Sequence, residues 1–348
     1  MFYERMIEKG WLPDAALRAG IRWQLKNRLN KLDKSAEQGF QKKWIEQLKQ
    51  SPIAIMTDAA NEQHYEVPTD FFCQVLGRHM KYSSGNWAVQ DADLDASEEA
   101  MLRLTMQRAE IRDGQHILEL GCGWGSLSLE MARRYPRSQI TAVSNSHTQK
   151  TWIDRVAANE GLTNLHVITE NIENFSPETQ FDRVVSVEMF EHLRNYEKLF
   201  ERISKWLKAD GKMFVHIFCH REYSYPFDPD PSSWMATYFF SGGIMPSENL
   251  FRYFDKDLRV TKTWKVSGLH YHRTCEAWLT RADARKESIL KLFTQAYGAE
   301  HALKWFHYWR VFFLACSELF RFNQGDEWYV CHYLFEKNDL TSNTEKFR

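Results

Sequence analysis

Residues 116–125, which read HILELGCGWG, constrain the fold of this chain more than any other stretch. A short apolar run carries one acid, Glu119, and three glycines then fall within five positions. This pattern is typical of a buried parallel strand, a tight turn and a helix N-terminus. Gly121 and Gly123 allow the backbone positive φ angles and close approach to a ligand. A Gly-rich turn that binds nothing is the alternative interpretation.

The spacing of the acid and the glycines narrows the class of ligand. The chain reads Glu-x-Gly-x-Gly-x-Gly, whereas a dinucleotide-binding turn reads Gly-x-Gly-x-x-Gly. A carboxylate directly before the turn would repel a pyrophosphate. The pattern therefore favours a cationic or zwitterionic ligand.

Strands and helices alternate regularly from this turn onward. The apolar patterning predicts strands at 116–120, 140–143, 165–169, 181–187 and 212–218. It predicts helices at 126–134, 146–160 and 196–207, and an earlier one at 95–111. Such alternation indicates βαβ units, so we expect an α/β fold with a doubly wound, mainly parallel sheet.

The rest of the chain divides around this core. We expect an N-terminal helical segment (1–60) that packs on the main domain as a cap, and a cofactor-binding core (61–220). Residues 221–338 begin with a Pro- and aromatic-rich insertion and continue with helices at 283–320 and a closing strand at 328–335. We expect this region to form a lid over the carboxyl edge of the sheet. A polar tail, 339–348, completes the chain.

Composition excludes several classes of function. A net charge of −1 gives no support for nucleic-acid binding. The six cysteines are scattered without metal-ligand spacing, so we expect reduced thiols, no metal site and a cytoplasmic location. No apolar stretch reaches the roughly 18 residues that a membrane span needs, so stable membrane insertion is not expected. A homodimer is left open.

Polar residues follow the second and third predicted strands. Ser144 and Asn145 end the second strand, Gln149 lies one turn into the next helix, and Asn171 and Ile172 end the third. Ligands of open α/β sheets bind at the carboxyl ends of strands. The amide and hydroxyl groups could hold ribose hydroxyls, and Asn171 and Ile172 could contact an adenine ring. Each of these residues could equally well be an ordinary polar loop residue that contacts no ligand.

The fourth strand ends in the most unusual cluster, Glu188-Met-Phe-Glu191-His192. If the chain turns helical there, Glu188 and His192 share a face with Glu191 adjacent. Such a group could orient and deprotonate an ammonium or hold a developing cation. A helix N-terminus with favourable acids and a structural histidine is the alternative. His216 and His220, on and just after the fifth strand, favour the functional interpretation.

Several motifs occur together in a specific order. They are ELGCGWG, TAVSNSHTQK, VEMFEH, HIFCHR, FFSGGIMP, SGLHYHRT and YWRVFFLACSELF. Taken together, the chain resembles the coclaurine N-methyltransferase-like branch of the cyclopropane-fatty-acyl-phospholipid synthase superfamily. The resemblance runs from the N-terminal helices to about Lys337 and implies a Rossmann-like class I methyltransferase that uses S-adenosyl-L-methionine.

The resemblance also implies roles for individual residues. Glu188, Glu191 and His192 occupy the positions that matter for catalysis in benzylisoquinoline N-methyltransferases. The implied cofactor contacts are Tyr82, Ser83, Glu119, Gly121, Gly123, Asn145, Gln149 and Asn171, to which the strand-end analysis adds Ser144 and Ile172. Asn171 departs from the Asp expected at its position.

Other departures separate the two branches of the superfamily. Cyclopropane synthases hold a bicarbonate base with a Cys, a Glu, a His and a Tyr. Here Glu191 and His216 remain, but the Cys position is Ser84 and the Tyr position falls on Phe312. Two of the four ligands have changed, which argues against methylene transfer to a lipid alkene.

We therefore expect an S-adenosylmethionine-dependent methyltransferase whose partner is a small-molecule amine, methylated on nitrogen without a metal. The expected substrate pocket has largely aromatic walls drawn from 221–330, at Trp234, Phe239, Phe312 and Trp328, and is bordered by His216 and His220. One alternative is a cyclopropane synthase-type enzyme acting on unsaturated acyl chains. Another is a protein that binds the cofactor without catalysis.

Overall fold

The computed structural model describes residues 2–55, 67–89, 91–227, 234–240 and 242–338. The predicted boundary at 60/61, part of the Pro-rich insertion and the tail at 339–348 lie outside these residues. The helices are α1 (Phe2–Glu8), α2 (Asp14–Glu37), α3 (Phe40–Gln50), α5 (Thr69–Val75), α6 (Leu94–Arg108), α7 (Ser126–Arg134), α8 (His147–Asn159), α9 (Tyr196–Trp206), α10 (Trp234–Tyr238), α11 (Gly268–Ala284), α12 (Lys286–Tyr297) and α13 (Ala299–Arg321). The strands are β1 (His116–Leu120), β2 (Gln139–Ser144), β3 (Leu165–Thr169), β4 (Phe181–Val187), β5 (Leu207–His220), β6 (Tyr225–Pro226), β7 (Ile244–Met245), β8 (Leu258–Val266) and β9 (Trp328–Lys337).

The main sheet has seven strands in the order β3-β2-β1-β4-β5-β9-β8. The strands from β3 to β5 are parallel, β9 runs antiparallel to β5, and β8 runs antiparallel to β9. The predicted α/β doubly wound fold is therefore confirmed, including the closing strand. The five predicted parallel strands match β1 to β5 to within a few residues at each end.

Alternation along the strands sorts side chains between the two faces of the sheet. On β5, Met213 and Val215 lie in the cluster packed by α9 and α3, whereas Phe214 lies in the cluster packed by α6 and α7. Because the side-chain period of a strand is two, His216 lies on the same face as Phe214. The same alternation on β1 turns Glu119 away from Leu118 and Leu120, toward α7.

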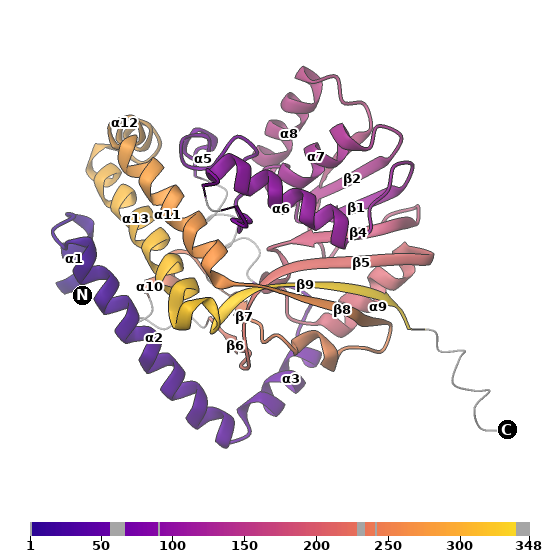
Figure 1. Ribbon diagram of the computed structural model, residues 1–348, viewed down its shortest axis with the longest axis horizontal. Helices are drawn as coiled ribbons and strands as arrows, with labels where there is room; N and C mark the ends of the chain where they lie inside the picture. The colour runs from indigo at the N-terminus through magenta and orange to yellow at the C-terminus, as the bar shows by residue number, and fades with distance from the viewer. Residues whose placement is uncertain (1, 56–66, 90, 228–233, 241, 339–348) are drawn as a thin grey trace.

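The helices α11, α12 and α13 form a layer beside the carboxyl end of the sheet, and α1 and α2 lie along its outer side (Figure 1). The aromatic cluster of this layer includes Phe71, Trp278, Phe293, Trp309 and Phe312. Within the part of the chain that the structure describes, no helix combines the length and apolar character that crossing a bilayer requires.

Three local predictions differ from the structure. The sheet contains β8, which was not predicted because its charged residues and a bulge between Val260 and Lys262 interrupt the alternation typical of a strand. The helical region at 283–320 is two helices separated at Gly298, and the helix before it begins at Gly268. The chain does not turn helical at Glu188. Instead Glu188 has φ +50°, and only a short 3-10 turn, Phe190–His192, follows.

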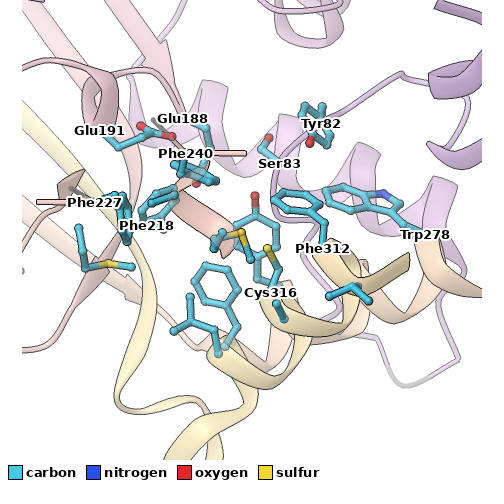
Figure 2. Close-up of a pocket in the computed structure, with 18 of the residues that line it drawn as sticks. Tyr82, Ser83, Glu188, Glu191, Phe218, Phe227, Phe240, Trp278, Phe312 and Cys316 are labelled. Carbon is cyan, nitrogen blue, oxygen red and sulfur yellow. The ribbon is translucent and has the colours of Figure 1, made fainter. Parts of the chain in front are cut away.

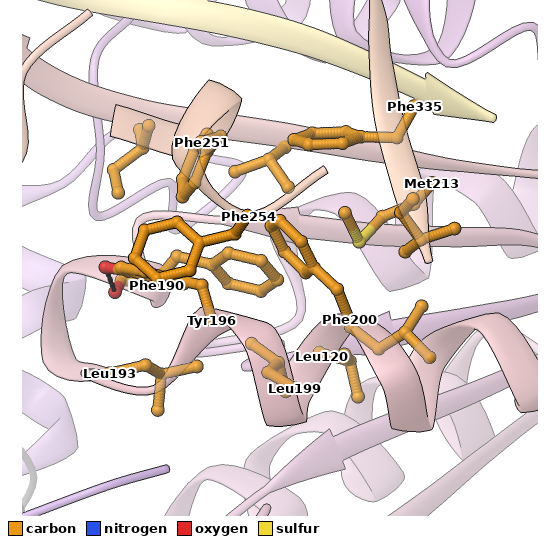
Figure 3. Packing of buried hydrophobic residues seen from close by; sticks show 14 of the residues in the cluster. Leu120, Phe190, Leu193, Tyr196, Leu199, Phe200, Met213, Phe251, Phe254 and Phe335 are labelled. Carbon is orange, nitrogen blue, oxygen red and sulfur yellow. Dashed lines mark hydrogen bonds between the residues drawn. The ribbon is translucent and has the colours of Figure 1, made fainter. Parts of the chain in front are cut away.

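The 3-10 turn is held from behind by the core. The Tyr196 hydroxyl donates to the carbonyl oxygen of Phe190 over 2.8 Å, and both rings are fully buried with Phe200 and Phe251 (Figure 3). The segment that carries the two acids of the fourth strand is thereby fixed at the carboxyl edge of the sheet.

Candidate active site

Two adjoining cavities open at the carboxyl ends of the parallel strands. The larger has a volume of about 470 Å³ and the smaller about 90 Å³. Five residues line both: Gly121, Gly123, Gln149, Glu188 and His192. The cavities therefore meet between the Gly-rich turn after β1 and the acidic segment after β4.

The Gly-rich turn has the backbone conformation that its sequence predicts. Gly121 has φ +74°, and a Cβ there would lie 2.5 Å from Met189 Cγ. Gly123 has φ +53°, and a Cβ there would meet nothing within 4 Å. Because L side chains rarely adopt such φ angles, glycine is required at Gly121 and leaves open space at Gly123.

Glu119 lies at the floor of the larger cavity. Its side chain is 2 % exposed and accepts a hydrogen bond from the Ser128 hydroxyl at the start of α7. Burial raises the pKa of Glu119 to about 8, against the hydrogen bond from Ser128 and the charge of Lys81.

The ends of β2 and β3 line the smaller cavity with Ser144, Asn145, Asn171 and Ile172. The Ser144 hydroxyl donates to Gln149 Oε1 over 2.6 Å, so the amide nitrogen of Gln149 turns away from it. That nitrogen is buried and has no hydrogen-bond partner among the described residues. A buried amide donor without a partner is costly, so a ligand oxygen or nitrogen placed there would satisfy it.

Asn171 is more engaged than the sequence suggested. Its Oδ1 accepts the backbone N–H of Glu173 over 2.9 Å, a local turn contact of the kind that Asn favours. Contact between Asn171 and an adenine ring stays a prediction.

These features fit S-adenosylmethionine. The chain supplies a glycine turn with open space, a buried acid in the larger cavity and an orphaned amide donor at the shared wall. Tyr82 and Ser83 also line the larger cavity. All ten predicted cofactor residues therefore surround the two cavities.

Sequence reasoning missed a buried lysine beside this site. Lys81 is 1 % exposed and its Nζ donates to the Ser83 hydroxyl. Burial lowers the pKa of Lys81 to about 8, against the charges of Glu188, Glu98 and Glu119. A lysine within an otherwise uncharged run, MKYSSGNW, was the only signal in the sequence.

The acidic segment brings two carboxyl groups together at the junction of the cavities (Figure 2). The Glu188 side chain is 8 % exposed and Glu191 is 2 % exposed, and the two carboxyls share a hydrogen bond. Burial raises the pKa of Glu191 to about 8 and that of Glu188 well above its usual range, and the proximity of Glu191 adds to the shift at Glu188. Two acids this close and this buried hold at least one proton at neutral pH.

His192 joins the acids at the same junction. Its ring stacks on Phe240, with 5.8 Å between centroids and 7° between planes, and it lines both cavities. The structure thus brings together Glu188, Glu191 and His192, although by a turn rather than by a shared helix face.

Aromatic and sulfur-containing side chains form a large part of the wall of the larger cavity. Figure 2 shows Phe218, Phe227 and Phe240 beside the acids, with Phe312, Trp278 and Cys316 on the α11 and α13 side. Trp234 and Phe312 are the predicted substrate residues that line it. The helices α1 and α2 complete the wall, through residues such as Ile7, Leu17, Ile21 and Arg28. The sequence predicted that these helices pack on the main domain as a cap, but not that they line the cavity.

Four residues predicted for the substrate pocket line neither cavity as built from the described residues: His216, His220, Phe239 and Trp328. All four are 0 % exposed. Phe239 lies behind Phe312, stacked at 4.5 Å between centroids, and Trp328 donates to the Tyr225 hydroxyl over 3.1 Å.

The two histidines lie on the same face of β5 as Phe218, which lines the larger cavity, but both are covered by neighbouring groups. His220 Nδ1 accepts the backbone N–H groups of Glu222 and Tyr223, and so caps a turn. His216 lies behind Glu188, with its Nε2 3.2 Å from Glu188 Oε1. Sequence position alone placed them at the correct sheet edge but could not separate a lining residue from a supporting one.

Two observations concern metals and thiols. No group of three or more His, Cys, Asp or Glu side chains suited to a metal ion occurs among the described residues. All six cysteines are described and each is a free thiol.

The chain is similar in sequence and structure to several known proteins. The profile of the family described as mycolic acid cyclopropane synthetase matches residues 55–330. The (S)-coclaurine N-methyltransferase of Thalictrum flavum subsp. glaucum is 38 % identical over 341 residues, covering 96 % of this chain and 94 % of the relative. The cyclopropane-fatty-acyl-phospholipid synthase of Escherichia coli (strain K12) is 30 % identical over 244 residues, covering 67 % of this chain and 61 % of the relative.

A crystal structure of coclaurine N-methyltransferase bound to N-methylheliamine and SAH (S-adenosylhomocysteine) superimposes with a TM-score of 0.92. It is 36 % identical and the match covers 96 % of this chain and 99 % of the other. A mycolic acid cyclopropane synthase complexed with SAH matches with a TM-score of 0.67 at 21 % identity, covering 83 % of this chain and 100 % of the other, and shows the common fold.

Proposed function

Because the chain belongs to the mycolic acid cyclopropane synthetase family and is an S-adenosylmethionine-dependent methyltransferase, we propose that it methylates the nitrogen of a small aromatic amine. Relatives named coclaurine and pavine N-methyltransferase, at 38 % and 33 % identity, support this proposal. The observation that carries it is the buried pair of carboxyls at the junction of the two cavities.

We assign the cofactor to the wall that joins the cavities. Glu119, Gly121, Gly123 and Gln149 would hold it on one side and Tyr82 on the other, with Ser83, Ser144, Asn145, Asn171 and Ile172 completing the contacts. When bound, S-adenosylmethionine supplies an electrophilic methyl group on a sulfonium. The chain's own residues must then present a neutral amine nitrogen and exclude water.

The carboxyl pair suits the first of these tasks. An ionised carboxyl at the junction attracts an ammonium, and burial strengthens that attraction because the local dielectric is low. Burial also raises the pKa of both acids, which brings their proton affinity closer to that of an amine. Glu188 and Glu191 would therefore bind the ammonium, and one of them or His192 would take its proton and leave a lone pair on nitrogen.

The aromatic wall suits the second task. Phe218, Phe240 and Phe312 cover the cavity beside the acids with apolar surface (Figure 2). Aromatic faces attract cations as well as apolar rings, so the wall would accept an amine attached to an aromatic system.

Lipid modification is the other chemistry found among the relatives. The structure describes the two side chains, Ser84 and Phe312, that argue against this chemistry. The Ser84 hydroxyl is fully buried and donates to the Gly85 carbonyl oxygen, and Phe312 presents a ring without a hydroxyl. Neither side chain offers the thiol or phenol that the sequence resemblance associates with a bicarbonate base.

The direct test offers methyl-labelled S-adenosylmethionine two kinds of acceptor in parallel. One is a panel of secondary and tertiary aromatic amines, and the other is a suspension of unsaturated phospholipid. We expect label in an amine product. Label in the lipid extract alone would overturn the proposal, and label in neither would reject both acceptor classes.

A paired variant tests the role of the acids. Glu191→Gln removes the proton acceptor and keeps the shape, so we expect turnover to fall roughly 10²- to 10⁴-fold. Calorimetric affinity for SAH should change less than twofold. Glu98→Gln is the matched control, because Glu98 is also fully buried with a pKa raised to about 7 but lines neither cavity of the described structure. Equal losses in both variants would contradict the assignment.

A further inference from the structure

A row of side chains crosses the sheet behind Glu188. In the strand register His216 of β5 lies opposite His332 of β9, and Trp264 of β8 lies opposite His332 on the other side. Both histidines are 0 % exposed, and they lie on the face of the sheet that α6 covers. Arg108, in the last turn of α6, reaches this row and stacks over Trp264 at 5.2 Å.

Three short contacts connect the row into a chain. Arg108 Nη1 lies 2.9 Å from His332 Nδ1, and His332 Nε2 lies 2.9 Å from His216 Nδ1. His216 Nε2 lies 3.2 Å from Glu188 Oε1. Neither of these last two atoms has an aligned hydrogen-bond partner in the part of the chain that the structure describes, so their 3.2 Å approach is a close contact rather than an aligned hydrogen bond. Both atoms are buried, and a hydrogen bond between them would satisfy both.

Donors and acceptors along this row of contacts can be arranged in only one direction, from Arg108 toward Glu188. A guanidinium donates hydrogen bonds and cannot accept them, so His332 Nδ1 must be the acceptor. Burial lowers the pKa of both histidines well below its usual range, so each ring is neutral and carries one proton. The proton of His332 therefore sits on Nε2 and is donated to His216 Nδ1. The proton of His216 then sits on Nε2 and faces Glu188.

We propose that Arg108, His332 and His216 are positioning residues that fix one N–H of His216 beside Glu188 Oε1. The proposal rests on the proposed function, because it gives Glu188 a part in binding the amine. A donor beside Oε1 favours the ionised form of Glu188, and so opposes burial and the proximity of Glu191, which both raise the pKa of Glu188.

Arg108 sets the direction in which the two histidines donate their protons. Its charge does not change in the working range of pH, and successive hydrogen bonds in a buried chain polarise one another. Lys81 also places positive charge near Glu188, but it has no hydrogen bond to either histidine and cannot select their tautomers.

The first test reads the tautomers without any acceptor. Protein labelled with ¹⁵N in the imidazole rings is measured by NMR with SAH bound, and the two rings are assigned from His216→Gln and His332→Gln. We expect the Nε2–H tautomer at both histidines. Arg108→Met should introduce the Nδ1–H tautomer at His332, whereas Arg108→Lys, which still donates, should not. An Nδ1–H tautomer at His332 in the unsubstituted protein would overturn the proposal.

The second test reads turnover with whichever acceptor takes the label. Arg108→Met should lower kcat roughly ten- to hundredfold, a part of what a general base contributes, and leave KM and SAH affinity within about twofold. Arg108→Lys should restore most of the rate. Arg103→Met, one turn away on α6 and exposed, is the matched control. Unchanged kcat in Arg108→Met would overturn the proposal even if the variant is less stable. Failure of the amine assay alone would leave the tautomer result standing and reject only the proposed function.

Discussion

The two cavities that meet at Glu188 are built in different ways. The smaller is lined almost entirely by the turns that follow β1, β2, β3 and β4, from Leu120 to Leu193. The larger draws on the whole chain, from Ile7 on α1 to Phe320 on α13. Backbone geometry and short polar side chains shape the first, whereas interlocking rings shape the second.

Because of this difference, the two cavities should differ in how well they tolerate amino-acid substitutions. A turn that needs positive φ at Gly121 and a close approach of Met189 accepts no side chain there. A wall made of rings can repack, because volume-conserving apolar substitutions usually cost little. We therefore expect the smaller cavity and its turn to tolerate few substitutions and to accept one cofactor. The larger cavity should determine which amine is used.

The largest effect should come from breaking the turn. Gly121→Ala introduces a Cβ 2.5 Å from Met189 Cγ at φ +74°. Affinity for SAH, measured by calorimetry, should fall at least on the order of tenfold, because strain of about 1–2 kcal/mol must be relieved by movement of the turn.

Gly114→Ala is the matched control for this variant. Gly114 has φ +88° and open space around it, and it lies before β1 away from both cavities. It should lower the melting temperature by a similar strain and leave SAH affinity unchanged. If both variants lose affinity equally, the turn is not a binding element.

A smaller effect should come from the aromatic wall. Phe312→Leu removes a ring that lines the larger cavity and stacks on Phe239. Aromatic pairs contribute about 0.5–1.5 kcal/mol beyond burial, so KM for the amine should rise roughly three- to tenfold with SAH affinity unchanged. Phe306→Leu, at a buried position on the same helix that lines neither cavity of the described structure, should affect stability alone. A rise in KM with Phe306→Leu would remove the distinction between wall and core.

The smallest effect should be a pH dependence of stability in the protein without cofactor. The pKa values of Glu119 and Glu191 are raised to about 8 by burial. The folded state then holds more protons than the unfolded state between their ordinary value of 4.5 and 8. Stability from these groups is complete below pH 4.5 and is lost as pH rises through 8. The melting temperature should therefore fall by a few degrees from pH 6 to pH 8.

Glu191→Gln should reduce this fall, because glutamine mimics the protonated acid at every pH. Lys81 acts in the opposite sense only above pH 8, where its lowered pKa makes the folded state lose its proton first. Glu201→Gln, at a partly exposed acid on α9, is the control. A change in melting temperature between pH 6 and pH 8 that is the same in Glu191→Gln as in the unsubstituted protein would contradict the raised pKa of Glu191.

The sequence predicts the smaller cavity well because its determinants are local. Glu119 and the glycines follow one another along the chain, and strand ends of a parallel sheet meet at one edge. The residues 144–149 and 171–172 could be placed there without a structure for the same reason.

The rest depends on how distant segments pack. Whether His216 lines the cavity or supports Glu188 depends on the groups packed around it, among them His332 on β9. Lys81 is buried near acids of other segments, Glu98, Glu119 and Glu188. On β8, Lys262 interrupts an otherwise alternating run of apolar and polar residues. Periodicity contains none of this information.

The most direct test of the account is the crystal structure of the protein with SAH and an aromatic amine. We expect SAH against the Gly-rich turn and the strand ends, with the amine in the larger cavity. Its nitrogen should lie within about 2.6–3.2 Å of a carboxyl oxygen of Glu188 or Glu191. An amine bound with its nitrogen remote from both acids, and the two carboxyls still paired with each other, would contradict the account.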